Sequence, residues 1–411
     1  MVDSIENAQV PRTQEAMWHD TWLPAETVEL RTKARVAVEK AVAPVARRIG
    51  EMEESTESFP WDAFRGLADS GLFGVPFDSS FGAGLEYPML GTCTVTEEIA
   101  YHSSSMAGVY DGQCILVPQA LSFATEQLRA KLLPALITGT EAFSFATTEP
   151  DASSDLSVEA LQTVATPTEG GYLVSGRKRW ITNSVVATWA TVLVRSGNRM
   201  DMLAIDLASP GIRIGRPDRK MGHRGQITAD IILDDVFVPS ENLLGTPGSG
   251  LSVALSCLTR GRIGIGAAGV GVAQAAVDLA VHRLRTRNVF GGPLGKMQYW
   301  QFKMAERATE IECARSLYQK AAMRLDQGDR NAEPEAAMAK AYGTRVAVDT
   351  VRDALQIHGG FGFAREVGET GESVRLEELY RDAKILEIFE GANELQQWVV
   401  ARRLIGRDVT G

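Results

Sequence analysis

The chain has 411 residues, of which 45% are hydrophobic and 23% are charged, and acidic residues outnumber basic ones by 52 to 42. This composition is typical of a globular enzyme of two or three domains, and it excludes an intrinsically disordered chain. The formal net charge of −10 argues against a nucleic-acid-binding protein, which would need a basic face.

The first twenty residues, MVDSIENAQVPRTQEAMWHD, contain no apolar core behind a positive stretch. They are therefore typical of neither a secretory signal nor a transit peptide. No later run reaches the roughly 18 apolar residues that a membrane-spanning helix needs. Four cysteines lie far apart without a CxxC pair, and five histidines show no metal-ligand spacing. We therefore expect a cytoplasmic protein with free thiols, no membrane segment and no metal.

Three regions differ in the spacing of their apolar residues. From about residue 25 to 140 the spacing is helical, as in the stripe Leu30, Ala34 and Val38. Between about 142 and 246, short β-rich runs alternate with turn residues. Long helical stripes return from about 250. The sequence predicts an α+β protein with an N-terminal extension (1–26), an N-terminal helical domain (27–141), a small central antiparallel β domain (142–248) and a C-terminal helical bundle (249–411).

The segment GIGAAG, Gly264 to Gly269, matches the GxGxxG fingerprint of dinucleotide-binding folds. That fingerprint requires a preceding strand within a βαβ unit, whereas the residues before Gly264 have helical spacing. We therefore reject a nicotinamide site here, and we interpret the small residues as a place where helices approach each other closely.

Two polar segments stand in the β region. TTEPDASSD (147–155) is typical of a turn, yet its hydroxyls and backbone N–H groups also suit a pyrophosphate or the edge of a flavin ring. In KRWITN (178–183), Trp180 belongs either to the sheet core or to the cover of an aromatic cofactor, with the Thr182 hydroxyl reaching a ring nitrogen. Together, in a β region between helical ones, the two segments favour a cofactor site.

Near the C-terminus, Glu390 stands directly after Ile388-Phe389 and directly before Gly391, in the segment KILEIFEGANELQQ. Such an acid either faces water at a helix boundary or lies where water is scarce. The second arrangement is costly unless the site requires it. The residues alone leave both possibilities open.

Seven segments resemble, in the same order, the acyl-CoA dehydrogenase family of flavoproteins, and the resemblance extends from about residue 27 to 405. It implies a β domain between N-terminal helices and a C-terminal four-helix bundle, with FAD bound between the β domain and the bundle. The segments are TTEPDASSD (147–155), KRWITN (178–183), KMGHRG with DDVFVP (220–225 and 234–239), RTRNVFGGPL (285–294), QIHGGFGF (356–363), RDAKI (381–385) and IFEGANELQ (388–396).

The resemblance implies two groups of FAD-binding residues. The first lies around the flavin ring and pyrophosphate within one subunit, and it comprises Phe145, Thr147, Thr148, Ser154, Trp180, Ile181, Thr182, Ala392 and Glu394. The second completes the FAD site of a neighbouring subunit, and it comprises Arg287, Phe290, Gln298, Gln356, Gly359 and Gly360. A homotetramer built as a dimer of dimers is therefore expected.

Glu390 occupies the position of the family's catalytic base, which implies an acyl-CoA dehydrogenase of fatty acid metabolism. Glu390 is expected to remove the α-proton of an acyl thioester while flavin N5 accepts the β-hydrogen as hydride, which leaves a trans-2-enoyl thioester. Electrons are expected to pass to an electron-transfer flavoprotein. Because the positions that set pocket depth include a bulky and a polar residue, we expect a short, branched or functionalised acyl group. The expected substrate-binding residues are Ser154, Arg262, Tyr110, Asp111 and Gly391.

Several positions depart from the family pattern. Gln226 stands where serine is common, and Ala392-Asn393 replaces a Thr-Ser pair. An acidic, glycine-containing insertion lies within 364–384, which predicts a surface loop.

Two alternative functions differ from this expectation. One is a flavin oxidase or N-hydroxylating monooxygenase of the same fold, in which the glutamate is often replaced. The other is a flavin-bearing nucleic-acid-binding protein, which would need a basic extension and conflicts with the acidic composition.

Overall fold

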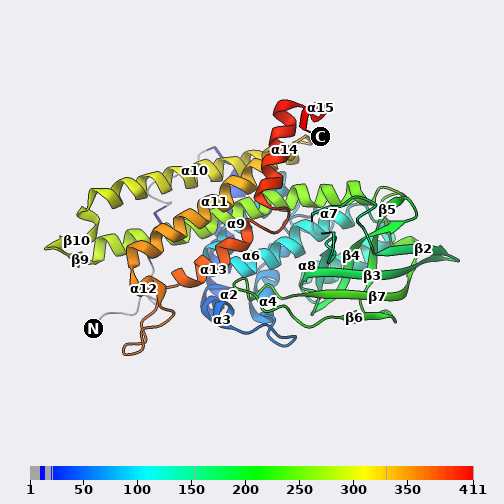
Figure 1. The fold of residues 1–411 in the computed structure, drawn as a ribbon, viewed down its shortest axis with the longest axis horizontal. Coiled ribbons are helices and arrows are strands. Elements are labelled where there is room, and N and C mark those ends of the chain that lie inside the picture. The colour runs from blue at the N-terminus through cyan, green and yellow to red at the C-terminus, as the bar shows by residue number, and fades with distance from the viewer. Residues whose placement is uncertain (1–9, 14–19, 21, 153, 330, 411) are drawn as a thin grey trace.

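The computed structural model of the protein describes residues 10–13, 20, 22–152, 154–329 and 331–410, so most of the predicted N-terminal extension lies outside it. The N-terminal region is helical (Figure 1). The stripe of Leu30, Ala34 and Val38 is buried on α2, which packs against α5. Its helices are α2 (Ala25–Ala41), α3 (Ala46–Glu51), α4 (Trp61–Asp69), α5 (Pro88–His102), α6 (Ser104–Asp111), α7 (Val117–Leu121) and α8 (Glu126–Thr138), with helical turns η1 (Ala43–Val45), η2 (Leu72–Gly74) and η3 (Gly112–Leu116).

The central region of the described chain forms an eight-stranded sheet with the order β6-β7-β3-β2-β4-β5-β8, and β1 is added on β4. Most neighbours are antiparallel, as predicted, but β1 and β2 run parallel to β4, so the sheet is mixed. The strands are β1 (Ala142–Ala146), β2 (Val164–Thr168), β3 (Gly171–Thr182), β4 (Ala187–Ser196), β5 (Arg199–Asp206), β6 (Ile212–Ile214), β7 (Thr228–Pro239) and β8 (Leu243–Leu244), with the turn η4 (Ser240–Asn242) before β8.

Long helices return after the sheet and form the C-terminal helical domain. Helices α9, α10 and α11 lie lengthwise beside one another, and α13 and α14 pack on α11 (Figure 1). The predicted α+β class and the order of helices, sheet and helical bundle are confirmed. The elements are α9 (Gly250–Thr286), β9 (Asn288–Val289), β10 (Gly292–Pro293), η5 (Leu294–Lys296), α10 (Gln298–Asp326), α11 (Glu333–His358), α12 (Gly360–Phe363), α13 (Leu376–Leu386), α14 (Asn393–Ile405) and α15 (Arg407–Thr410).

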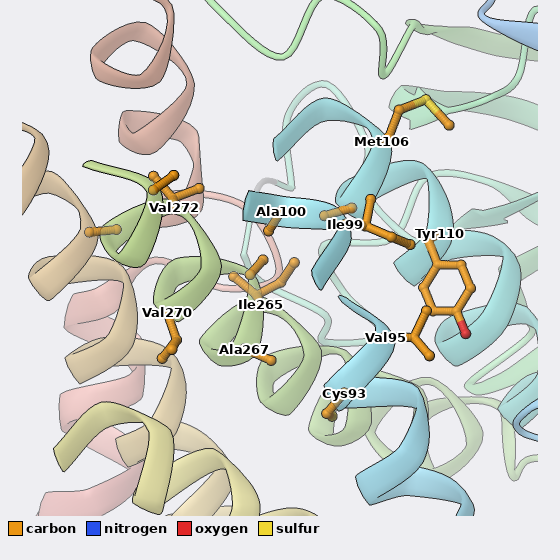
Figure 2. Packing of buried hydrophobic residues seen from close by; sticks show 14 of the residues in the cluster. Cys93, Val95, Ile99, Ala100, Met106, Tyr110, Ile265, Ala267, Val270 and Val272 are labelled. Carbon is orange, nitrogen blue, oxygen red and sulfur yellow. The ribbon is translucent and has the colours of Figure 1, made fainter. Parts of the chain in front are cut away.

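Helix α9 forms the centre of the hydrophobic core. Figure 2 shows Ile265 of α9 beside Ile99 and Ala100 of α5, and these side chains belong to one buried cluster. Full burial of one isoleucine side chain stabilises the folded state by roughly 1.5–3 kcal/mol relative to leaving it exposed. By length and composition α9 could cross a membrane, which we did not expect from the sequence, but 94% of its most apolar window is buried inside the protein. Its apolar composition is accounted for by the core.

The GIGAAG segment lies inside α9, so the strand that a dinucleotide fingerprint requires is not there. A Cβ on Gly266 would lie 2.9 Å from the main chain of Ala339, and a Cβ on Gly269 would lie 2.6 Å from the carbonyl oxygen of Gly343. Because Ala339 and Gly343 belong to α11, the two helix backbones approach closely at this point. The interpretation of the small residues as a helix-packing site is confirmed.

The insertion within 364–384 begins as an irregular segment between α12 and α13. Its residues from Arg365 to Gly371 are mostly exposed, and Glu366 pairs with Arg47 of α3 at 2.9 Å. The prediction of a surface loop is confirmed for this part, whereas the later part of the segment forms α13.

Candidate active site

A cavity of about 1540 Å³ lies between the sheet, helix α9, the α6–η3 segment and the connection from α13 to α14. Small-molecule sites commonly occupy about 300–1,000 Å³, so this cavity has room for more than one ligand. Most of the residues that the sequence predicted for a single subunit line it. They are Asp111, Phe145, Thr147, Thr148, Ser154, Trp180, Ile181, Thr182, Arg262, Glu390, Gly391 and Ala392.

Trp180 reaches the cavity because of an irregularity in β3. The pairing of β3 with β7 shifts register between Lys178 and Ile181, and Trp180 adopts a left-handed backbone with a φ of 56°. Bulges of this kind re-aim side chains and are common beside active sites. Trp180 is 58% exposed, so it is not part of the sheet core, which was one of the two possibilities left open by the sequence.

Glu390 lies in the turn between α13 and α14, with a φ of 53°. A left-handed backbone at a non-glycine residue costs roughly 1–3 kcal/mol and tends to persist at functional sites. The Oε2 atom of Glu390 is buried and receives no hydrogen bond from an N–H or hydroxyl group of the described residues. Gly261 of α9 leaves the space for this oxygen, because a Cβ there would lie only 2.0 Å from it. Of the two possibilities for this acid, the structure favours the one in which water is scarce.

Asp111 is a second carboxyl group in the same cavity wall. It ends α6 directly before η3, a π-helical turn, and π-helical turns often mark functional sites. The residue is 1% exposed, and neither of its carboxyl oxygens accepts a hydrogen bond from an N–H or hydroxyl group of the described chain. A Cβ at Gly264 would lie 2.3 Å from Asp111 Oδ1. Gly261 and Gly264, almost one turn apart on α9, therefore make room for two acids.

The two carboxyl groups affect each other's protonation. Burial raises the pKa of Asp111 well above its usual value, and the nearby negative charge of Glu390 raises it further. Burial also raises the pKa of Glu390, while a hydrogen bond from Asp111 and the positive charges of Lys340 and Arg262 act in the opposite direction. Asp111 is thus the group that keeps its proton, and it shares that proton with the Glu390 carboxylate.

Lys340 is a charged residue of this site that the sequence analysis missed. It lies on α11, is fully buried, and donates a hydrogen bond from Nζ to Asn393 Oδ1 at 2.9 Å. Burial lowers the pKa of Lys340 to about 7, although the negative charges of Glu390 and Glu387 act to raise it. A lysine within a helical stripe of small residues was the only signal for it in the sequence.

The segment that begins with Thr147 is fixed to the sheet by a buried ion pair. Lys178 Nζ donates to Glu149 Oε1 at 2.7 Å and to the carbonyl oxygen of Thr147 at 3.1 Å. The Glu149 carboxylate also accepts hydrogen bonds from the backbone N–H groups of Gln162 and Thr163. Because these bonds fix the backbone, the hydroxyls of Thr147 and Thr148 are presented at the cavity from a rigid support.

Replacing Lys178 with methionine should destabilise the fold by about 3–5 kcal/mol, because Glu149 would be left as a buried charge without its counterion. Urea unfolding followed by circular dichroism measures this change. Lys320→Met, at an exposed position, is the matched control and should stay within about 0.5 kcal/mol of the wild type. The double variant Lys178→Met with Glu149→Leu should recover much of the loss, and an unchanged single variant would contradict the assignment.

Several predicted residues do not line the cavity. Tyr110 is buried in the core and its hydroxyl donates to the carbonyl oxygen of Leu72 at 2.8 Å, so it is not part of a substrate pocket wall. Glu394 is exposed on α14. The second group lies exposed at or beyond the far end of α9 and around the end of α11, away from the sheet (Figure 1), and comprises Arg287, Phe290, Gln298, Gln356, Gly359 and Gly360. Within the described residues, no group of three or more His, Cys, Asp or Glu could hold a metal ion.

Comparison with known proteins gives a consistent result over most of the chain. Three family models match in order: "Acyl-CoA dehydrogenase, N-terminal domain" at 24–140, "middle domain" at 144–236 and "C-terminal domain" at 248–405. The 3-(aryl)acrylate reductase of Clostridium sporogenes is 34% identical over 92% of this chain and 97% of its own.

Two further matches cover similar shares of the chain. The caffeyl-CoA reductase-Etf complex subunit CarC of Acetobacterium woodii is 34% identical over 92% of this chain and 97% of its own. The structure of butyryl-CoA dehydrogenase from Megasphaera elsdenii superposes with a TM-score of 0.86 at 30% identity, and covers 94% of this chain and all of its own. The chain therefore belongs to the acyl-CoA dehydrogenase family of flavin-linked oxidoreductases.

Proposed function

We propose that the protein is an FAD-dependent dehydrogenase that converts a short, branched or functionalised acyl-CoA to the trans-2-enoyl-CoA, with Glu390 as the catalytic base. One observation carries this proposal. The Glu390 carboxylate, whose Oε2 atom is buried and whose hydrogen-bonding neighbour is the Asp111 carboxyl group, lines the same cavity as an exposed tryptophan and the Thr182 hydroxyl. A base and a surface suited to a flat ring thus line one cavity.

The residues at the cavity fit FAD. Trp180 offers an exposed aromatic ring, and among the described residues the hydroxyls of Thr147 and Thr148 have no hydrogen-bond partner of their own. Phe145 and Ile181 supply apolar walls, and Ser154 is exposed at the cavity, where a pyrophosphate would need a hydroxyl. When bound, FAD supplies an acceptor for the β-hydrogen of the substrate as hydride. The family dependence on FAD supports this assignment.

Glu390 takes the α-proton of the thioester in this mechanism. The α-proton is weakly acidic, so a carboxylate can remove it only if burial strengthens the carboxylate as a base. Burial raises the pKa of Glu390, which brings the two acidities closer. The positive charges of Lys340 and Arg262 oppose that rise and so favour the ionised form of Glu390.

The shape and polarity of the cavity support a small or functionalised acyl group. Gly108, Asp111, Gly112 and Leu116 line the part formed by α6 and η3, and a neutral carboxyl there is poorly suited to a long alkyl chain. The names of the relatives, which mention arylacrylate, caffeyl-CoA and butyryl-CoA, agree with short or aryl-bearing substrates. Two of these names describe reductases.

The remaining assignments of the proposal concern partners and location. An electron-transfer flavoprotein is the proposed acceptor, supported by the relative that is named as a subunit of an Etf complex. A dimer of dimers is proposed because Arg287, Phe290 and Gln356 lie exposed and away from the cavity of their own chain, where a neighbouring subunit's FAD would need them. The proposal also includes a role in fatty acid metabolism and a cytoplasmic location. It places the domain boundaries at 26/27, 141/142 and 248/249.

Anaerobic titration of the FAD-loaded protein with a panel of acyl-CoAs tests the function. Butyryl-CoA, isobutyryl-CoA or 3-phenylpropionyl-CoA should bleach the flavin absorbance, whereas palmitoyl-CoA should not. Turnover with a dye acceptor, compared as kcat/KM, ranks the substrates. Absence of bleaching with every acyl-CoA would overturn the proposal, and rapid reoxidation of the reduced protein by oxygen would instead favour the oxidase alternative.

A further inference from the structure

A chain of buried polar side chains leads from the protein interior to Thr182 at the cavity. Ser104 Oγ lies 2.7 Å from His223 Nε2, His223 Nδ1 lies 2.8 Å from Gln226 Oε1, and Gln226 Nε2 lies 3.1 Å from Thr182 Oγ1. Ser104, His223 and Gln226 are each at most 5% exposed. This array includes Gln226, one of the positions at which the sequence departs from the family pattern.

The hydrogen bonds of this chain have a definite direction. The Gln226 carbonyl oxygen can only accept, so His223 Nδ1 must carry a hydrogen. Burial lowers the pKa of His223 to about 4, so the ring is neutral near pH 7 and its Nε2 accepts from the Ser104 hydroxyl. The Gln226 amide nitrogen can only donate, so the Thr182 oxygen receives this bond.

Packing holds the Gln226 amide in place. A Cβ on Gly108 would lie 2.9 Å from Cδ, Nε2 and Oε1 of Gln226, so the absence of a side chain at Gly108 creates the slot that the amide fills. The His223 ring packs edge-on against Phe389, with ring centroids 5.7 Å apart, and its backbone N–H donates to Asp382 at 2.7 Å. The array is therefore rigid and adjoins the residue that precedes Glu390.

We infer that Gln226 is a positioning residue for Thr182: by donating to Thr182 Oγ1, it leaves the single hydroxyl hydrogen of Thr182 free to point into the cavity as a donor to the flavin ring. A threonine hydroxyl has one hydrogen and can either donate it into the cavity or turn it toward the protein. An amide donor at position 226 selects the first state. A hydroxyl hydrogen that points at the hydride-accepting ring nitrogen N5 stabilises the oxidised ring more than the reduced one, because N5 accepts a hydrogen bond only in the oxidised ring and carries its own hydrogen after reduction. This inference rests on the proposed binding of FAD at the face formed by Trp180 and Thr182.

The midpoint potential of the bound flavin tests the inference in the FAD-loaded protein. Gln226→Glu replaces the donor by an acceptor of the same shape, so the Thr182 hydroxyl should turn toward position 226. We expect oxidised FAD to lose about tenfold in affinity relative to reduced FAD, as for the loss of one hydrogen bond, which is a shift of about +30 mV for a two-electron couple. Gln226→Ser, whose shorter side chain carries no amide donor to Thr182, should shift the potential in the same direction.

Gln119→Glu is the matched control, because Gln119 Nε2 also donates to a hydroxyl, that of Ser256 at 3.2 Å, but outside this cavity. It should leave the flavin potential unchanged. In a Thr182→Val background, Gln226→Glu and Gln226→Ser should produce no further shift, since the hydroxyl they act on is absent.

The outcomes separate the inference from the function on which it rests. If Thr182→Val shifts the potential but neither Gln226 variant does, Gln226 does not position the hydroxyl and the inference is wrong. A shift by the Gln226 variants that persists in the Thr182→Val background overturns it equally. If Thr182→Val leaves both the potential and the flavin spectrum unchanged, the flavin does not lie against Thr182, and the proposed placement of FAD fails instead.

Discussion

Glu390→Gln should bind FAD normally and lose flavin bleaching by acyl-CoA by about 10²–10⁴-fold, the range that a positioned general base contributes. Glutamine keeps the size of the side chain, and the space next to Gly261 accommodates it. It cannot take up a proton at neutral pH. Because the variant removes only the proton acceptor, the measured rate of anaerobic bleaching isolates the chemical step, while the flavin spectrum reports that the cofactor is still held.

Glu387→Gln is the matched control for this prediction. Glu387 follows the end of α13 three residues before Glu390, and its carboxylate pairs with Lys384 at 2.6 Å. Its replacement should change the bleaching rate by less than about twofold, as expected for one partly exposed ion pair. Bleaching at the wild-type rate in Glu390→Gln would show that another group accepts the α-proton, and the mechanism would then have to be abandoned.

The fold was predictable because apolar spacing within each segment decides its local structure. The stripe on α2 is buried as its period indicates, and the glycines of α9 lie where α9 and α11 touch, so helical spacing correctly outweighed the match to a nucleotide fingerprint. The parallel pairing of β1 and β2 with β4 was missed, because strand partners are set by long-range contacts that leave no mark on the spacing within one strand.

The site residues could be predicted from the sequence only where they belong to short contiguous motifs. Glu390 and Trp180 stand in contiguous segments, whereas the contact of Glu390 with Asp111 joins segments from opposite ends of the chain. Tyr110 and Asp111 are adjacent in sequence, but neighbouring positions on a helix point about 100° apart. Consequently Asp111 reaches the cavity and Tyr110 enters the core. Lys340 was missed because its helix supplies only small neighbours, and its relation to Glu390 appears only after α11 packs on α9.

Removal of the Asp111 carboxyl should shift the pH dependence of catalysis by an amount that depends on the replacement. Asp111→Leu removes the hydrogen bond that lowers the pKa of Glu390, so that pKa should rise and the acidic limb of the kcat/KM profile should move to higher pH. Asp111→Asn keeps an N–H donor next to Glu390, so the acidic limb should move much less. The measurement is kcat/KM against pH with the best substrate of the acyl-CoA panel.

The Asp111→Asn variant should also change how the stability of the fold depends on pH, and linkage fixes the direction of that change. The folded pKa of Asp111 is raised, so above about pH 4 the folded state holds a proton that the unfolded state has released. The stability contributed by this group therefore falls as pH rises. Asp111→Asn has no such proton, and its melting temperature should increase relative to that of the wild type between about pH 4 and pH 8.

Asp326→Asn is the matched control for both measurements, since it alters another acid whose pKa partial burial raises, to about 6. The Asp326 carboxylate accepts hydrogen bonds from the backbone N–H groups of Met89 and Leu90 at 2.9 Å, outside the cavity that holds Glu390. Its variant should change stability and leave the acidic limb of the profile in place. If instead the wild type, Asp111→Leu and Asp111→Asn share one acidic limb, the two carboxyl groups titrate independently. When two carboxyl groups share a proton, removal of one of them must change the pKa of the other.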